Sequence, residues 1–582
     1  MSPLVPAAVR RLVLRFPAES ICIAILLVMG LNLLSLAAQK TITNDEVVHI
    51  PAGYQYVRAG KFNLNPEHPP LVKMLAGSPL LPLKLTSGSF TSSANQDWGL
   101  RTLSSAMDFW RLNRERYIAI SLLARLPMIL LTLALGALIF IYGRQLFGPR
   151  AGVFAVVLFS LEPTMLGHGW IVHTDIAGAL GYLLFFFMLH NFCRTPTLSR
   201  AVWLGFGTSF ALLTKFSMII LLPVLVLGFV YVVWRAPRPG SSRSNLALRC
   251  GLAVLILILA INAAYLFQHP TLPPADAIWL SGAIPAFSAR ATIALQVLSK
   301  IFPTYYLFGI YTVMVHNSFG HPAGLLGNYS TSGWWYYFPV VFALKTTIPF
   351  LLVSVSSLAW ALWRVIGKGE KQLLALLIPI AIYLAFAMTS HINIGIRHIA
   401  PVFPFLFLLG GVGLNRMLQA NWRPKLARVL VACLIGWMVV DAARVYPDYM
   451  SFVNPLRSGR PGWQVVSDSN IEWGQDVGAL AGYLHAHGEA KVSGALSGGW
   501  ATLDLYHIQL VEFAPSDMKS ARTRYVAIGA GFLNGSTVPG GLRDANDEVI
   551  SEEQRQNYFA GYRSATPEVV FGNSIYLYRV RD

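Results

Sequence analysis

The chain has 582 residues, of which 55% are hydrophobic and 12% are charged. Soluble globular domains carry about 25% charged residues, so this composition excludes an ordinary water-soluble protein. The net charge of +18 would suit a nucleic-acid-binding protein, but such proteins gather Lys and Arg on one soluble face. Many basic residues stand here in short groups between apolar blocks, a pattern that sets membrane topology, and we expect no nucleic-acid partner.

The apolar residues form blocks long enough to cross a bilayer, for which a helix needs about 20 residues. Because backbone polar groups in lipid must bond within their own segment, each block predicts a membrane helix. The first block carries no charge and is expected to be retained rather than cleaved as a signal peptide. We expect about eleven spans, near residues 20–38, 117–142, 151–168, 176–193, 201–215, 217–234, 250–267, 338–363, 372–389, 397–415 and 429–445.

Basic residues on alternating connections, beginning with Arg10 and Arg11, predict which side of the membrane each loop faces. Connections rich in Lys and Arg remain in the cytoplasm. The N-terminus is therefore expected to be cytoplasmic, and the long loops 39–116 and 268–337 extracytoplasmic. An odd number of spans also places the C-terminus outside. The expected location is the inner (plasma) membrane, in contact with its lipids.

The composition changes after about residue 445, where charged residues become frequent and long apolar blocks stop. Residues 477–487 predict an amphipathic helix, and residues 491–496, 524–528 and 574–580 predict strands. The expected fold class is thus mostly α: a polytopic membrane domain over 1–445, followed by a small extracytoplasmic α/β domain over 446–582.

The first outer loop opens with two adjacent carboxylates, Asp45 and Glu46, shortly after the first span. Their mutual repulsion and desolvation beside a bilayer can shift a pKa and leave one of them a good base. A surface-exposed helix cap accounts for the pair equally simply. Asp45 and His49 are four residues apart, which suits a metal on one helical face. The His-Glu-x-x-His motif is absent, however, so a divalent metal is possible but not expected, and we expect no cofactor.

The same loop continues with Glu67, His68, a pair of prolines and Lys73. The prolines stiffen the backbone and remove two hydrogen-bond donors, which holds His68 and Lys73 near the membrane surface. A cation fixed there could bind a lipid phosphate and neutralise it as it departs. A simple basic anchor at the interface is the alternative.

Further ionisable residues fall at other outer turns. His173 and Asp175 precede a span, where a carboxylate is either favoured by the helix dipole or turned towards a cavity. Arg397 and His398 stand between two apolar runs, and a buried arginine needs a phosphate or a carboxylate as partner. Lys215 and Lys345 lie at outer span ends, where lysines more commonly snorkel towards water.

Together these motifs resemble the membrane glycosyltransferases of the GT-C fold, and most nearly the protein O-mannosyltransferase and aminoarabinose-transferase superfamily. The similarity extends from about residue 20 to residue 480 and keeps the family's motif order. The matching segments are Asp45-Glu46, His68-Pro69-Pro70-Leu71-x-Lys73, His173-Thr174-Asp175, Gly333-Trp334-Trp335-Tyr336-Tyr337-Phe338-Pro339, Ile394-Gly395-Ile396-Arg397-His398 and the segment 468–476.

The resemblance implies an inverting transfer of a sugar from a polyprenyl-phosphate carrier to an acceptor hydroxyl on a glycan, lipid or protein. By similarity Asp45 is the general base, Glu46 assists it or contacts the acceptor, and Asp175 is a second acidic residue. The donor phosphate is expected to contact His68, Lys73, Arg397, His398, Lys215 and Lys345, with His49, Glu67 and His173 in support. His68 is a departure from the aminoarabinose transferases, which have Lys there; the mannosyltransferases have His.

Two other functions fit part of the pattern. A transporter or flippase for lipid-linked sugars would share the spans and the phosphate-binding cations, but inverted repeats are expected of it and none is evident. A non-catalytic receptor would use the outer tail as a binding module and would not need Asp45. A metal-dependent, oligosaccharyltransferase-like enzyme is a closer variant, with Asp45 and Asp175 among its ligands.

Overall fold

The computed structural model describes residues 15–86, 96–235, 242–283, 285–420, 423–543 and 547–580. Arg10 and Arg11, on which part of the topology prediction depends, lie outside the described residues. Within them the chain is predominantly helical, with a five-stranded sheet near the C-terminus and a two-stranded sheet of β1 (Ala323–Leu325) and β2 (Asn328–Ser330). This confirms the predicted fold class as far as a mostly helical chain with a small sheet region near the C-terminus.

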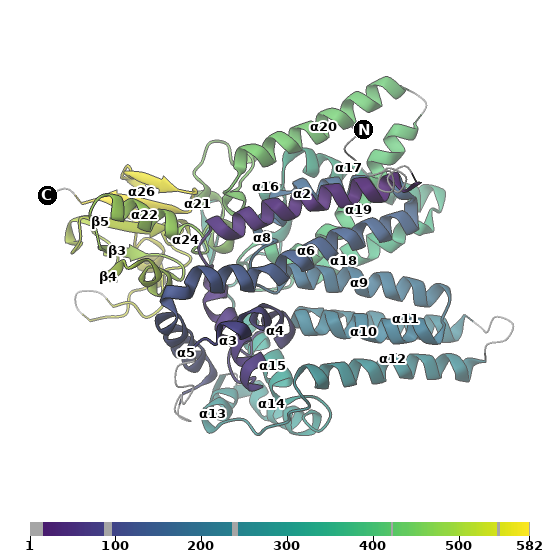
Figure 1. Ribbon diagram of the computed structural model, residues 1–582, viewed down its shortest axis with the longest axis horizontal. Helices are drawn as coiled ribbons and strands as arrows, with labels where there is room; N and C mark the ends of the chain where they lie inside the picture. The colour runs from purple at the N-terminus through teal and green to yellow at the C-terminus, as the bar shows by residue number, and fades with distance from the viewer. Residues whose placement is uncertain are drawn as a thin grey trace.

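Nine helical segments of the described residues are long and apolar enough to cross a membrane. Their main helices run alongside one another in Figure 1, and large apolar side chains cover their outer surfaces, such as Val28 at 69% exposure. A chain with this surface is a multi-pass membrane protein. The helices are α2 (Pro17–Gln39), α6 (Tyr117–Phe147), α9 (Asp175–Arg194), α11 (Leu221–Trp234), α12 (Arg243–Ala264), α17 (Ile348–Lys368), α18 (Leu374–Met388), α19 (Phe403–Gln419) and α20 (Pro424–Val445).

Three of the eleven predicted spans differ from the helices observed. The spans predicted at 151–168 and 201–215 correspond to shorter helices, α7 (Pro149–Leu161) of 13 residues and α10 (Leu198–Thr214) of 17 residues. The span predicted at 338–363 is two helices, α16 (Tyr337–Lys345) and α17. The backbone is extended between them, and Pro349 lies in the first turn of α17, where proline favours a helix start.

The two long loops fold into helices of their own, which gather at one end of the membrane helices (Figure 1). A buried ion pair joins the loops: Arg101 Nη2 lies 2.6 Å from Asp276 Oδ2. The loop helices are α3 (Asn44–Ala59), α4 (Pro70–Gly77), α5 (Trp98–Leu112), α13 (Pro274–Ala283), α14 (Pro285–Leu298) and α15 (Thr304–Phe319).

The C-terminal sheet lies at the same end as the loop helices (Figure 1) and has five strands in the order β4-β3-β5-β7-β6. The central strand β5 pairs in parallel with β3 and antiparallel with β7. Three strands and the helix α22 (Val477–Ala486) were predicted; β4 and β6 were not. The strands are β3 (Lys491–Ala495), β4 (Gln509–Phe513), β5 (Tyr525–Gly529), β6 (Val569–Phe571) and β7 (Ile575–Arg579).

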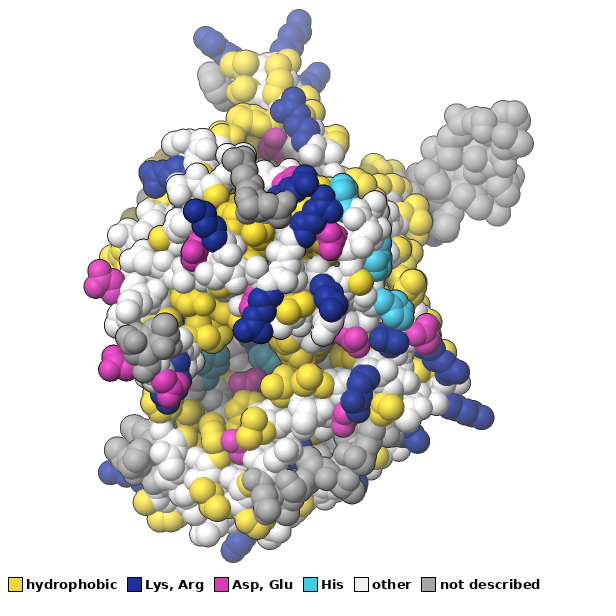
Figure 2. All heavy atoms as spheres, turned by 90° about the vertical axis from the view of Figure 1, so that its left-hand side faces the viewer, with side chains coloured by type: hydrophobic (Ala, Val, Ile, Leu, Met, Phe, Trp, Pro, Cys, Tyr) yellow, Lys and Arg dark blue, Asp and Glu magenta, His cyan; other side chains and the backbone are white. Residues whose placement is uncertain are grey.

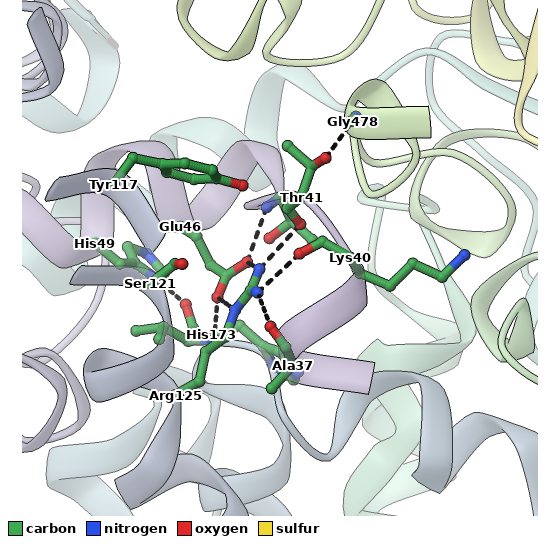
Figure 3. Close-up of polar contacts among 12 residues, drawn as sticks. Ala37, Lys40, Thr41, Glu46, His49, Tyr117, Ser121, Arg125, His173 and Gly478 are labelled. Carbon is green, nitrogen blue, oxygen red and sulfur yellow. Dashed lines mark hydrogen bonds and ion pairs between the residues drawn. The ribbon is translucent and has the colours of Figure 1, made fainter. Parts of the chain in front are cut away.

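A buried ion pair between Arg125 and Glu46 fixes the start of α3 (Figure 3). Arg125 Nε and Nη2 of α6 each lie 2.8 Å from a different carboxylate oxygen of Glu46. Arg125 also donates to the carbonyls of Ala37, Lys40 and Thr41 at 2.7–2.9 Å, so it holds the end of α2 as well. Burial alone would raise the pKa of Glu46, but the guanidinium of Arg125 outweighs it and lowers that pKa. Glu46 is thus a charged anchor of the backbone.

We predict that Arg125→Met destabilises the protein by roughly 3–5 kcal/mol, because Glu46 would remain buried without its partner. The measurement is thermal unfolding in detergent. Adding Glu46→Gln to the Arg125→Met variant removes the unpaired buried carboxylate and should restore part of the lost stability. Arg144→Met is the control, because its pair with Glu19 lies at the surface, with the Arg144 side chain 53% exposed. An unchanged unfolding temperature for Arg125→Met would contradict this account.

Candidate active site

A cavity of about 390 Å³ lies where the two long loops meet the membrane helices. Its residues come from α3, the loop before α4, the ends of α9 and α10, α15, α18 and η5 (Ile396–Val402). Figure 2 views the end that carries the sheet and shows a hollow with histidine and acidic side chains at its floor. The ionisable side chains that line the cavity are Asp45, Glu67, His68, Asp175, Lys215, His316, Arg397 and His398.

Two carboxylates and two cations meet in this cavity. Arg397 Nη1 lies 3.2 Å from Asp45 Oδ2 and 3.2 Å from Asp175 Oδ2, and Lys215 Nζ bonds the other oxygen of Asp175. The Asp175 side chain is 1% exposed, whereas that of Asp45 is 22% exposed. Asp175 is therefore enclosed between cations, and Asp45 is the carboxylate that a substrate can approach. The structure brings together four of the residues singled out in the sequence.

His173 and His49 hold the turn that carries Asp175. The Asp175 N–H lies 2.9 Å from Nδ1 of His173, the same nitrogen lies 3.1 Å from Asp175 Oδ2, and Nε2 lies 2.9 Å from the His168 carbonyl. His49 Nδ1 lies 3.0 Å from the Val172 carbonyl and connects the turn to α3. Burial lowers the pKa of His49 to about 4, so it is neutral at physiological pH. Neither imidazole lines the cavity. Both instead hold the backbone of the turn that carries Asp175.

Glu67 and His68 face the cavity from the proline-stiffened loop. Burial, and then the nearby charge of Asp45, raise the pKa of Glu67 to about 7. Burial lowers the pKa of His68 well below its usual value, so this side chain is a neutral hydrogen-bonding group instead of the expected cation. His398 also lines the cavity, and its Nε2 has no hydrogen-bond partner among the described residues. A phosphate oxygen could use that nitrogen.

Lys73 and Lys345 lie outside the cavity lining, contrary to their expected place beside the donor phosphate. Lys73 Nζ donates to the carbonyls of Asn65 at 2.5 Å and His68 at 2.8 Å and to Oδ1 of Asn65 at 3.1 Å. Lys345 Nζ donates to the carbonyls of Met450, at 2.6 Å, and Asn470. A buried ammonium needs such acceptors, and both lysines here hold loops in place. Lys345 does not snorkel, and Lys215 is engaged by Asp175.

The ligand atoms of Asp45, His49 and His68 lie within 4.8 Å of one another, close enough to hold a metal ion together. One carboxylate and two neutral imidazoles suit zinc. The anchored Nδ1 of His49 leaves its Nε2 as the ligand atom, an arrangement common at metal sites. The same carboxylate is already bonded to Arg397. An ion would therefore compete with that guanidinium for Asp45.

Several residues of the site escaped the sequence analysis. Arg125 was overlooked, although a charged residue inside the apolar run 117–142 is a recognised signal of function or structure. The segment 468–476 was noted only as a matching motif. Its Ser469 Oγ accepts a hydrogen bond from Arg397 Nε at 2.8 Å, and its Trp473 ring lies 4.0 Å from Arg397 Cζ. The apolar wall formed by α15 was also missed, because no helix was predicted there.

Comparison with known proteins gives one family match and several similar structures. Residues 120–263 match the family described as dolichyl-phosphate-mannose-protein mannosyltransferase. The ArnT protein of Cupriavidus metallidurans bound to undecaprenyl phosphate is 12% identical with a TM-score of 0.47, and covers 97% of this chain and 98% of its own. The Archaeoglobus fulgidus oligosaccharyltransferase in complex with Zn and sulfate is 12% identical with a TM-score of 0.45, and covers 88% of this chain and 68% of its own.

No curated protein matches the chain. The family match covers α9, α10 and α11 and most of α6 and α12, and so includes Arg125, Asp175 and Lys215. It confirms the resemblance that the motifs indicate: over residues 120–263 this membrane protein is similar to the dolichyl-phosphate-mannose-protein mannosyltransferases.

Proposed function

We propose that the chain is an inverting glycosyltransferase of the GT-C type, which moves a sugar from a polyprenyl-phosphate carrier to an acceptor hydroxyl outside the cytoplasm. The observation that carries the proposal is the meeting of Asp45, Asp175, Arg397 and Lys215 at one end of a cavity with apolar walls. A hydroxyl nucleophile needs a base, and a departing phosphate needs fixed cations. The family match supports the same reaction class.

The apolar walls suit the prenyl chain of the donor. Ile219, Met314 and Phe386 line the cavity, and they are 41%, 54% and 39% exposed. Ile219 and Phe386 belong to helical segments that are long and apolar enough to cross a membrane. We therefore propose that this wall of the cavity opens towards the bilayer. A carrier lipid can enter from the bilayer there and place its phosphate beside Lys215, Arg397 and His398.

Asp45 then removes the proton of the acceptor hydroxyl while that oxygen attacks the anomeric carbon. The new glycosidic C–O bond forms on the face opposite the phosphate, so the configuration at this carbon inverts. The bond from the anomeric carbon to the phosphate oxygen breaks, and polyprenyl phosphate leaves with the electron pair. Arg397 and Lys215 stabilise the charge that develops on that phosphate, and Asp175 keeps both cations in place.

We also propose the sidedness that the basic connections predict. The N-terminus is then cytoplasmic, the cavity opens to the outside of the inner membrane, and the chain divides near residue 445 into a transmembrane and an extracytoplasmic domain. α20 ends at Val445, and the sheet lies at the same end of the membrane helices as the loop helices (Figure 1). Two of those loop helices, α3 and α15, line the cavity. This supports the division and the shared side.

We predict that Asp45→Asn lowers kcat by roughly 100- to 10,000-fold, because the amide cannot accept the acceptor proton. Transfer of radiolabelled sugar from polyprenyl phosphate sugar to an acceptor measures the effect, and unfolding temperature confirms that the variant is folded. Asp108→Asn is the matched control on the same loop, because Asp108 pairs only at the surface with Arg111. Near wild-type turnover by purified Asp45→Asn would exclude Asp45 as the base.

Glu67 should make donor binding depend on pH. Its pKa is raised to about 7, so Glu67 is neutral below that pH and anionic above it, where it repels the donor phosphate. We predict that the KM for the donor rises as the pH increases through this range, and that Glu67→Gln makes the rise smaller. Donor KM measured at several pH values tests this. Glu115→Gln, at a side chain 80% exposed, is the control; an equal rise in Glu67→Gln would refute the role.

A further inference from the structure

A short segment that follows the last membrane helix returns to the cavity and contacts Arg397. It contains η8 (Asp468–Asn470) and continues to Trp473. Both Ser469 and Trp473 are buried, although they lie beyond the last membrane-crossing helix of the described chain. Neither residue lines the cavity. Their side chains are instead directed at a residue that does.

The segment holds the guanidinium of Arg397 at two places. Ser469 Oγ accepts a hydrogen bond from Arg397 Nε at 2.8 Å and donates one to the Ile394 carbonyl at 2.5 Å. The ring of Trp473 lies 4.0 Å from Arg397 Cζ, well within the range of a cation–π contact. Nε and one face of the guanidinium are therefore engaged, while Nη1 is directed towards Asp45 and Asp175.

A glycine at position 395 allows the segment to pack closely against the turn that carries Arg397. At Gly395 an added Cβ would lie 2.5 Å from Ser469 Oγ, so only glycine lets the segment pack here without a shift. Asn470 Oδ1 accepts from the Ile396 N–H at 2.9 Å, and its Nδ2 donates to Tyr337 Oη at 2.8 Å. The segment is thus bonded to two backbone groups directly before Arg397, the Ile394 carbonyl and the Ile396 N–H.

The same segment reaches the base. The Trp473 carbonyl accepts from the Asn44 N–H at 2.8 Å, directly beside Asp45, and the Gln475 carbonyl accepts from the Thr41 N–H at 3.0 Å. One stretch of chain is therefore bonded both to the turn that carries the phosphate-binding cation and to the start of the helix that carries the base. The distance between them depends on that stretch.

We propose that Ser469 and Trp473 are positioning residues that set the guanidinium of Arg397 for the donor phosphate. The inference rests on the proposed function. An arginine side chain has many rotamers, and a planar guanidinium binds phosphate well only in the right orientation. The tryptophan face fixes the plane of the guanidinium, and the serine hydroxyl fixes its rotation by holding Nε. The segment after the last membrane helix is then part of the transferase site.

The test uses the full-length protein and purified polyprenyl-phosphate sugar. Trp473→Leu removes the aromatic face, and we expect the donor KM to rise roughly tenfold while acceptor KM changes little. Trp473→Phe keeps a ring and should restore most of the donor affinity. Ser469→Ala is a smaller, independent change and should also raise donor KM. Trp463→Leu is the matched control, because Trp463 lies under Arg563, 5.9 Å from its Cζ, away from the cavity.

A double-mutant cycle with Arg397→Lys separates a positioning role from a general loss of structure. If Trp473 acts through Arg397, then Trp473→Leu adds little to the donor KM of the Arg397→Lys variant. An undiminished effect in that background, or an unchanged donor KM in both Trp473→Leu and Ser469→Ala, would overturn the positioning role while Asp45 and Arg397 keep theirs. An unchanged donor KM in Arg397→Lys itself would overturn both this inference and the proposed phosphate site.

Discussion

The site depends on one buried cation shared between two carboxylates. Arg397 bonds Asp45 and Asp175, and Asp175 also pairs with Lys215. Without substrate the two cations balance the two carboxylates, which makes their burial tolerable. Under the proposed function, a donor phosphate adds a negative charge and competes with Asp45 for Arg397. We propose that Asp175 then retains both cations and Asp45 is released, so that donor binding frees the proposed base for the acceptor.

Most of the other buried charged side chains near the cavity bind groups of the protein itself and do not face the cavity. Arg125 and Glu46 fix the start of α3, while Lys73 and Lys345 bind carbonyl groups of neighbouring loops. Burying a charged side chain costs free energy, and such side chains are retained where carbonyls of irregular backbone need hydrogen-bond donors. The loops at this end of the membrane contain many carbonyls outside regular helices. Buried cations donate hydrogen bonds to some of these carbonyls, and the backbone held in this way carries the side chains of the proposed site.

The sequence predicted the membrane helices well because uncharged apolar blocks of about 20 residues are typical of membrane spans and rare in soluble domains. It could not separate Lys215, which faces the cavity, from Lys345, which binds carbonyls, since both stand at the end of an apolar run. Asp45 and Arg397 are 352 residues apart, and no local pattern brings such residues together. Their meeting was expected only from the family resemblance. Pro349 was a local signal of the break before α17 that the sequence analysis did not use, whereas the helix α15 has no periodic signal.

The central claim is that the donor phosphate takes Arg397 away from Asp45, and a cryo-electron microscopy structure with bound polyprenyl phosphate tests it most directly. The account predicts phosphate oxygens within hydrogen-bonding distance of Arg397 and Lys215, a prenyl chain along the apolar wall, and a lengthened separation between Arg397 and Asp45. A phosphate bound away from these cations, or an Arg397 that still bonds Asp45 with the phosphate in place, would contradict it.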